Sequence, residues 1–75
     1  MDANHLIKMA NQIGQFFESM PDREQAKADI ASHLKRFWEP RMRTAILSAL
    51  DNSQADGLEP IVRDAIVAHR QLLTP

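Results

Sequence analysis

Three internal prolines, Pro21, Pro40 and Pro60, divide the 75-residue chain into segments of at most 20 residues. Proline lacks an amide N–H and disfavours the α conformation in the residue before it, so a helix ends before a proline or begins with it. Apolar residues between the prolines recur at three- and four-residue spacing, and glycines and β-branched residues are few. The sequence therefore predicts an all-α fold: a compact bundle of three to four short helices, forming one domain over residues 1–75.

The first helix is expected over residues 4–20, with Asn4 as its N-cap. Gly14 inside it costs about 1 kcal/mol relative to alanine. Close approach of another backbone is one reason to keep a glycine there, and simple tolerance is another. The second helix is expected over residues 23–38, with Asp22 as its N-cap and Gln25 completing a capping box.

Pro40 suits the first turn of a third helix. A polar loop over residues 51–57 ends this helix. In this helix Leu47 is placed off the apolar face, beside Arg43. Pro60 opens a fourth helix that continues to the end of the chain. The apolar faces together predict a core of Leu6, Ala10, Ile13, Phe17, Ala26, Ile30, Leu34, Phe37, Met42, Ile46, Ala49, Ile61, Ala65 and Leu72.

Composition narrows the class of protein. A domain of this length buries only about 60% of its unfolded surface, and without cysteine it has neither disulfides nor Cys-ligated metals to support it. Good helix packing or a partner protein must then stabilise it. The net charge of −1 at pH 7 gives no general attraction to nucleic acid. We expect no membrane span and no signal peptide, and therefore a cytoplasmic protein.

The sequence carries no recognisable catalytic constellation. The two glycines are isolated, so there is no phosphate-binding loop, and the serines and histidines have no triad-like spacing. His5, His33 and His69 lack a second ligand three or four residues away, so they are interpreted as boundary or hydrogen-bonded core residues. We predict no catalytic, cofactor-binding or metal-binding residue in this chain.

Rings and cations are concentrated in residues 33–43, which contain the only tryptophan and four of the nine Lys and Arg residues. One interpretation is structural: Phe37 is core, Trp38 caps the end of the bundle, and the arginines are solvated. The other is a docking surface, because Trp and Arg are enriched at the energetic centres of interfaces. In that interpretation Leu34, Phe37 and Met42 are core and Trp38 faces outward. The residues predicted to bind a partner are Phe16, Arg36, Trp38, Arg41 and Arg43.

Three segments of the chain resemble a known family. They are residues 9–17 (MANQIGQFF), residues 33–43 (HLKRFWEPRMR) and residues 57–62 (GLEPIV), of which the second is the most specific. Together they resemble the delta subunit of NAD-dependent, molybdenum-containing formate dehydrogenases. The resemblance extends from about residue 5 to residue 68.

The resemblance implies a non-catalytic accessory subunit of a soluble complex that oxidises formate to carbon dioxide with NAD as acceptor. The molybdenum cofactor, the iron–sulfur clusters and FMN would lie on other subunits, with no cofactor in this chain. The delta subunit would support assembly or stability by docking on the large catalytic subunit. Two alternatives stay open at this stage: a transient assembly factor for that enzyme, and a small helical nucleic-acid-binding module.

Overall fold

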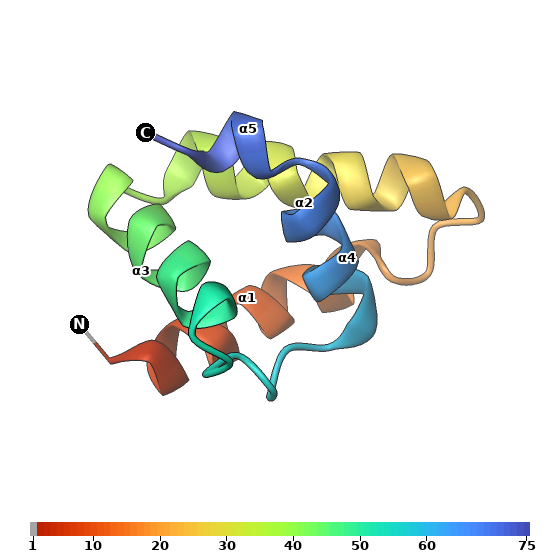
Figure 1. Cartoon of the computed structure of the whole chain (residues 1–75). Helices are drawn as coiled ribbons and strands as arrows, with labels where there is room; N and C mark the ends of the chain where they lie inside the picture. Colours follow the sequence, from red (N-terminus) through yellow and green to blue (C-terminus); the bar gives the residue numbers. More distant parts are fainter. Residues whose placement is uncertain (1) are drawn as a thin grey trace.

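A computed structural model describes residues 2–75, and all the regular secondary structure among them is helical. The five helices are α1 (Ala3–Phe17), α2 (Arg23–Phe37), α3 (Pro40–Asp51), α4 (Pro60–Ala68) and the one-turn α5 (Arg70–Leu73). In Figure 1, α2 runs along the top of the bundle, and α3 and α4 extend between it and α1. The predicted all-α bundle with breaks at Pro21, Pro40 and Pro60 is confirmed, and α5 is an addition to it.

The N-termini of the first two helices are capped by aspartates. The predicted N-cap at Asp22 is confirmed, because Asp22 accepts a hydrogen bond from the Gln25 amide at 3.2 Å. The Gln25 side chain donates to Asp29 at 2.9 Å, so it does not complete the predicted capping box. The predicted cap at Asn4 is wrong, because Asp2 takes that role and accepts from the Asn4 amide at 2.9 Å. The helix therefore starts before Asn4, and it ends at Phe17 rather than at residue 20 because Pro21 disfavours further helix.

Pro40 and Pro60 each occupy the first turn of a helix and follow a glutamate in extended conformation. Neither Glu39 nor Glu59 makes a side-chain capping bond. The starts of α3 and α4 therefore depend on proline, whose fixed φ suits the first turn and whose missing N–H needs no partner there.

The core joins all five helices. Most of the predicted core residues are buried, and Ile13, Phe17 and Met42 are partly buried against them. Two predictions are wrong: Phe37 is 65% exposed and Leu72 is 42% exposed. The fully buried side chains of at least valine size are Leu6, Ile30, Leu34, Ile46, Val62, Ile66 and Leu73.

The last turn of the chain shows why the Leu72 prediction failed. His69 has φ −114° and ψ 30°, so the predicted fourth helix is interrupted there and continues as α5. The interruption rotates the final residues relative to the α4 face, and it buries Leu73 in place of Leu72. Since α5 also contacts α3, a second side of α3 is covered, and Leu47 is buried although its position was predicted to lie off the apolar face.

The junction between α1 and the start of α4 is unusually close. Asn11 on α1 donates to the Gly57 carbonyl and accepts from the Glu59 amide, both at 2.9 Å, so one side chain holds the loop that precedes α4. One turn further along α1, a Cβ atom placed on Gly14 would overlap Cγ2 of Val62. Close packing therefore explains Gly14, although the atom that approaches it belongs to a side chain rather than to a backbone.

Gly14→Ala is expected to lower the free energy of unfolding by about 1–3 kcal/mol, because Val62 is β-branched and has little rotamer freedom in a helix. Chemical denaturation of the purified chain measures this change. The matched control is the same substitution in a Val62→Ala background, where the overlapping methyl is absent and the loss should shrink. Equal losses in the two backgrounds would show that the close contact is unimportant.

Two ion pairs tie helices together on the surface. Arg23 on α2 bonds to Asp64 on α4 at 3.0 Å. Arg70 on α5 makes two hydrogen bonds to the Asp51 carboxylate at the end of α3, at 2.9 and 2.6 Å. These hydrogen bonds hold the pKa of Asp51 below its usual range and raise the pKa of Arg70. The bidentate pair fixes α5 against the end of α3.

Because the folded-state pKa of Asp51 is lowered, its contribution to stability is complete above the unfolded-state pKa of about 4 and is lost as pH falls through the folded-state value. Asp51→Asn should therefore be slightly less stable than the wild type at pH 7, and the difference should vanish in strong acid. Thermal melts across this pH range measure it. Asp56→Asn, in the exposed loop, serves as the control and should show no comparable pH-dependent difference.

Candidate protein-binding surface

The turn from α2 into α3 consists of two extended residues, Trp38 and Glu39. Trp38 is the C-cap of α2, with φ −86° and ψ 133°, and its amide donates to the Leu34 carbonyl at 3.0 Å. Glu39 follows with ψ 156°, and Pro40 begins the next helix. In Figure 1 this turn lies at the left end of the bundle, where the light green ribbon reverses direction. Trp38 and Glu39 have little conformational freedom, because each is joined directly to a helix.

The two rings at the corner, those of Phe37 and Trp38, have the opposite exposure to the one predicted for a docking surface. Trp38 is only 5% exposed and belongs to the core, whereas Phe37 is 65% exposed. The prediction that Trp38 faces outward is wrong because it treated residue 38 as helical. Once the chain becomes extended at Trp38, the spacing of 100° per residue no longer gives the direction of its side chain. The two residues therefore have different roles: Trp38 packs inside and stabilises the corner, and Phe37 is exposed to solvent.

Arg43 also lies inside the molecule. It is 7% exposed and donates from Nη1 to the Leu73 carbonyl at 3.3 Å, while its Nε atom is buried without a hydrogen-bond acceptor among the described residues. The predicted outward position of Arg43 is wrong because α5 covers this side of α3. A cation placed at the last carbonyls of a helix is favourable, so Arg43 attaches the C-terminal turn to the bundle.

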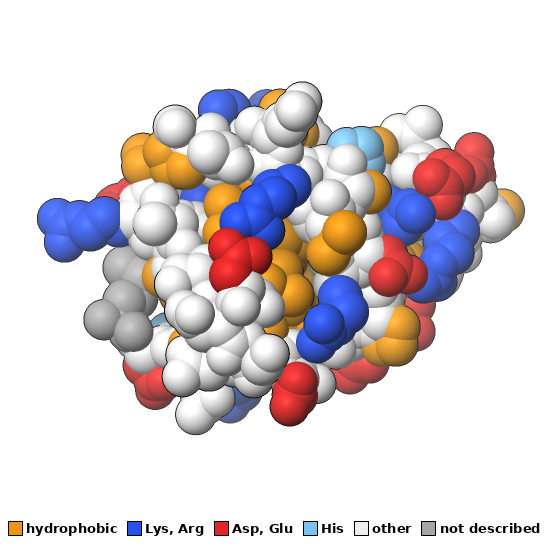
Figure 2. Space-filling model, in the orientation of Figure 1, with side chains coloured by type: hydrophobic (Ala, Val, Ile, Leu, Met, Phe, Trp, Pro, Cys, Tyr) orange, Lys and Arg blue, Asp and Glu red, His pale blue; other side chains and the backbone are white. Residues whose placement is uncertain are grey.

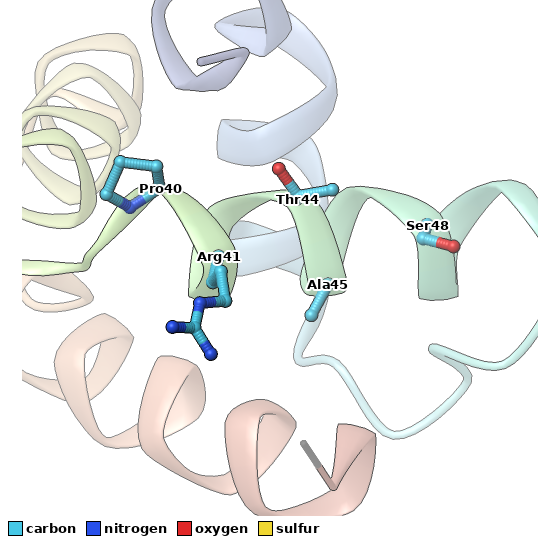
Figure 3. Close-up of a pocket in the computed structure, with 5 residues that line it drawn as sticks. All are labelled: Pro40, Arg41, Thr44, Ala45 and Ser48. Atoms are coloured by element: carbon cyan, nitrogen blue, oxygen red, sulfur yellow. The ribbon is translucent and has the colours of Figure 1, made fainter.

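The other three predicted partner-binding residues are exposed. Phe16 is 83% exposed, and it lies beside Phe17, which packs partly against the core. Arg36 is exposed in the last turn of α2. Arg41 is exposed in the first turn of α3, where it lines a shallow groove with Pro40, Thr44, Ala45 and Ser48; Figure 3 shows its guanidinium extending away from α3 on the side of α1.

Phe37 belongs to a chain of contacting rings that the sequence did not reveal. The His33 ring lies 4.7 Å from the Phe37 ring between centroids, and the Phe17 ring lies 6.4 Å from His33 in an edge-on arrangement. The Arg36 guanidinium carbon stands 5.6 Å from the centre of the Phe37 ring, within the range of a cation–π contact. We call these four residues, Phe17, His33, Arg36 and Phe37, the Phe37 cluster. The signal that would have revealed it is the four-residue spacing of His33 and Phe37, which places the two rings side by side on α2.

The charges around this cluster are biased. Lys35 and Arg36 occupy the last turn of α2, and between Asp29 and Asp51 the only carboxylate is Glu39. No ion pair among residues 2–75 involves Lys35, Arg36 or Arg41. The face drawn in Figure 2 shows basic and acidic side chains interspersed around a central area of hydrophobic atoms. Lys35, Arg36 and Arg41 are therefore three exposed cations close together in sequence and without an ion-pair partner among the described residues.

Among the described residues, no three His, Cys, Asp or Glu side chains are grouped so as to hold a metal ion. His33 belongs to the Phe37 cluster, His69 separates α4 from α5, and His5 is exposed. Within residues 2–75 none of the helices combines the length and apolar character that crossing a membrane requires. The corner presents one exposed ring, that of Phe37, and several exposed cations.

Trp38→Ala is expected to lower the free energy of unfolding by about 3–5 kcal/mol, because it leaves a large cavity in a small core. Phe37→Ala should change it by about 1 kcal/mol or less, since only its contacts with His33 and Arg36 are lost. Urea denaturation of the two variants makes the comparison, with each residue serving as the other's control. A larger loss for Phe37→Ala would contradict the assignment of the two rings.

Comparison with known proteins gives one match. A family model described as the NADH-dependent formate dehydrogenase delta subunit FdsD matches residues 5–66. The matched range contains nearly all of α1, all of α2 and α3, most of α4, and the whole Phe37 cluster. No curated protein and no solved structure gave a significant match.

Proposed function

Because the chain belongs to the family of NADH-dependent formate dehydrogenase delta subunits, we propose that it is a non-catalytic subunit of such an enzyme complex and that it supports assembly or stability by docking on the large catalytic subunit. In this proposal formate oxidation, with the molybdenum cofactor, the iron–sulfur clusters and FMN, belongs to the other subunits. The complex is soluble and cytoplasmic, and the chain acts through contact alone.

The observation that carries the proposal is the surface of the α2–α3 corner. Arg36 and Arg41 are exposed there, close in sequence to the exposed ring of Phe37, and none of these cations is paired within the described chain. The contacts that Phe37 makes within the chain contribute only about 1 kcal/mol or less to folding. Arginine beside an aromatic ring is characteristic of interface centres, because it combines bidentate hydrogen bonding with stacking.

Burial divides the five residues predicted to bind a partner into two groups. Phe16, Arg36 and Arg41 are proposed as direct contacts, since all three are exposed. Trp38 and Arg43 support the surface from within, since both are buried. Phe16 makes none of the ring contacts of the Phe37 cluster among the described residues, so its contact would be a separate one on α1.

The test is to co-express the chain with the other formate dehydrogenase subunits, with an affinity tag on the large catalytic subunit. We expect the chain to be retained in equimolar amount in the active enzyme through size-exclusion chromatography. Omitting the chain should lower the yield of assembled enzyme or shorten the half-life of formate-dependent NAD reduction on dilution. The matched control is a complex that contains the chain with Lys8→Glu, a charge reversal on the exposed side of α1.

Two outcomes would overturn the proposal. In the first, the chain binds only the large subunit that lacks its cofactors and is absent from active enzyme, which is the behaviour of a transient assembly factor. In the second, it does not co-purify with any subunit under mild conditions, which removes the docking role altogether.

A further inference from the structure

Phe37 has an exposed ring but is not among the residues proposed above as direct contacts. We infer that Phe37 is the anchor of the docking surface and that it inserts into an apolar pocket, rimmed by carboxylates, on the large catalytic subunit. This inference rests on the proposed function, which it makes more specific by stating the chemistry of the partner surface.

Phe37 differs from the other large apolar side chains that the described chain exposes. These are Phe16, Val67 and Leu72, with exposures of 83%, 61% and 42%, against 65% for Phe37. Of the two exposed phenylalanines, Phe37 has another ring and a cation packed against it, and Phe16 makes no such contact among the described residues. Exposed apolar residues that stand singly are ordinary, whereas an aromatic residue within a polar and cationic surround is characteristic of a binding surface.

The ring is also held in place before any partner binds. His33 packs on one side of it with centroids 4.7 Å apart, and Arg36 lies 5.6 Å from its centre. Phe37 is the last residue of α2, directly before the buried Trp38, so its backbone is fixed by the core. A side chain that is already ordered loses less conformational entropy on binding, which favours it as an anchor.

The surrounding charges specify the partner. Lys35, Arg36 and Arg41 take part in no ion pair among residues 2–75, and Glu39 is the only carboxylate between Asp29 and Asp51. Arg36, which packs on the Phe37 ring, and the other cations close to it in sequence are complementary to carboxylates at the rim of a pocket that receives the ring. A phosphate backbone would instead need cations spread along a groove-sized face, and the net charge of the chain is −1.

The experiment uses the co-expressed complex captured through the large subunit, and it measures how much of the chain remains bound during serial dilution. Phe37→Ala should raise the concentration at which half of the chain dissociates by about tenfold or more, as loss of an interface anchor does. The matched control is Val67→Ala on α4, which truncates another exposed apolar side chain and should dissociate with the wild type. Thermal melts of the isolated variants check that both are folded.

A second variant tests the charges. Arg36→Glu should weaken retention at low salt, and the affinity of the variant should depend less on salt than that of the wild type. Lys8→Glu changes the charge by the same amount on the exposed side of α1 and should leave retention unchanged.

The outcomes separate the two proposals. If the wild-type chain binds and Phe37→Ala binds equally well, the anchor is wrong while the docking role stands. If the wild-type chain does not bind the large subunit, the proposed function fails first. Release of the wild-type chain from the complex by nuclease treatment would show that nucleic acid, and not a carboxylate-rimmed pocket, meets the cations.

Discussion

Trp38 and Glu39 alone connect α2 to α3, and both are extended; for Glu39 the cause is Pro40, which disfavours the α conformation in the residue before it. This short link places α3 across α1 and brings the other side of α3 under α5. It also directs Trp38 into the core while Phe37, one residue earlier, stays on the helix and outside. The packing of the C-terminal turn and the composition of the exposed corner both depend on this one change of backbone conformation.

The three segments that carry the family resemblance differ in how far the fold explains their residues. Two of them meet at the junction of α1 and α4, where Asn11 holds Gly57 and Glu59 and where Gly14 makes room for Val62. Packing and backbone hydrogen bonding account for these residues without reference to a partner.

The third segment is only partly explained by the fold. Leu34, Trp38 and Arg43 are buried and have structural roles, whereas Arg36, Phe37 and Arg41 are exposed. The exposed members of this most specific segment are therefore those for which a contact outside the chain is the simplest physical reason.

Sequence reasoning succeeded where helices are regular. The prolines predicted the breaks between helices, Asp22 predicted the start of α2, and the three- and four-residue spacing predicted most of the core. It failed at helix ends, for Trp38 and Phe37 at the end of α2 and for Leu72 beyond His69. A helical projection assumes a constant rotation per residue, and that assumption ends where the backbone leaves the helix.

Two of the five residues predicted to bind a partner, Trp38 and Arg43, lie inside the molecule. Arg43 and Leu47 were placed outside because periodicity describes one face of α3 and cannot show that α5 covers another. The contact of His33 with Phe37 follows from their four-residue spacing on α2, whereas the contact of Phe17 with His33 depends on the packing of α1 against α2.

Stability and binding are linked in a domain this small. A 75-residue chain without disulfides has a modest free energy of unfolding, and any partner that binds only the folded form increases it through mass action. The buried members of the corner, Trp38 and Arg43, set the population of the folded form. In the proposed complex, the exposed members would set the affinity of that form. A substitution of either kind would then lower occupancy of the complex, and only a separate measurement of folding distinguishes a lost contact from a lost scaffold.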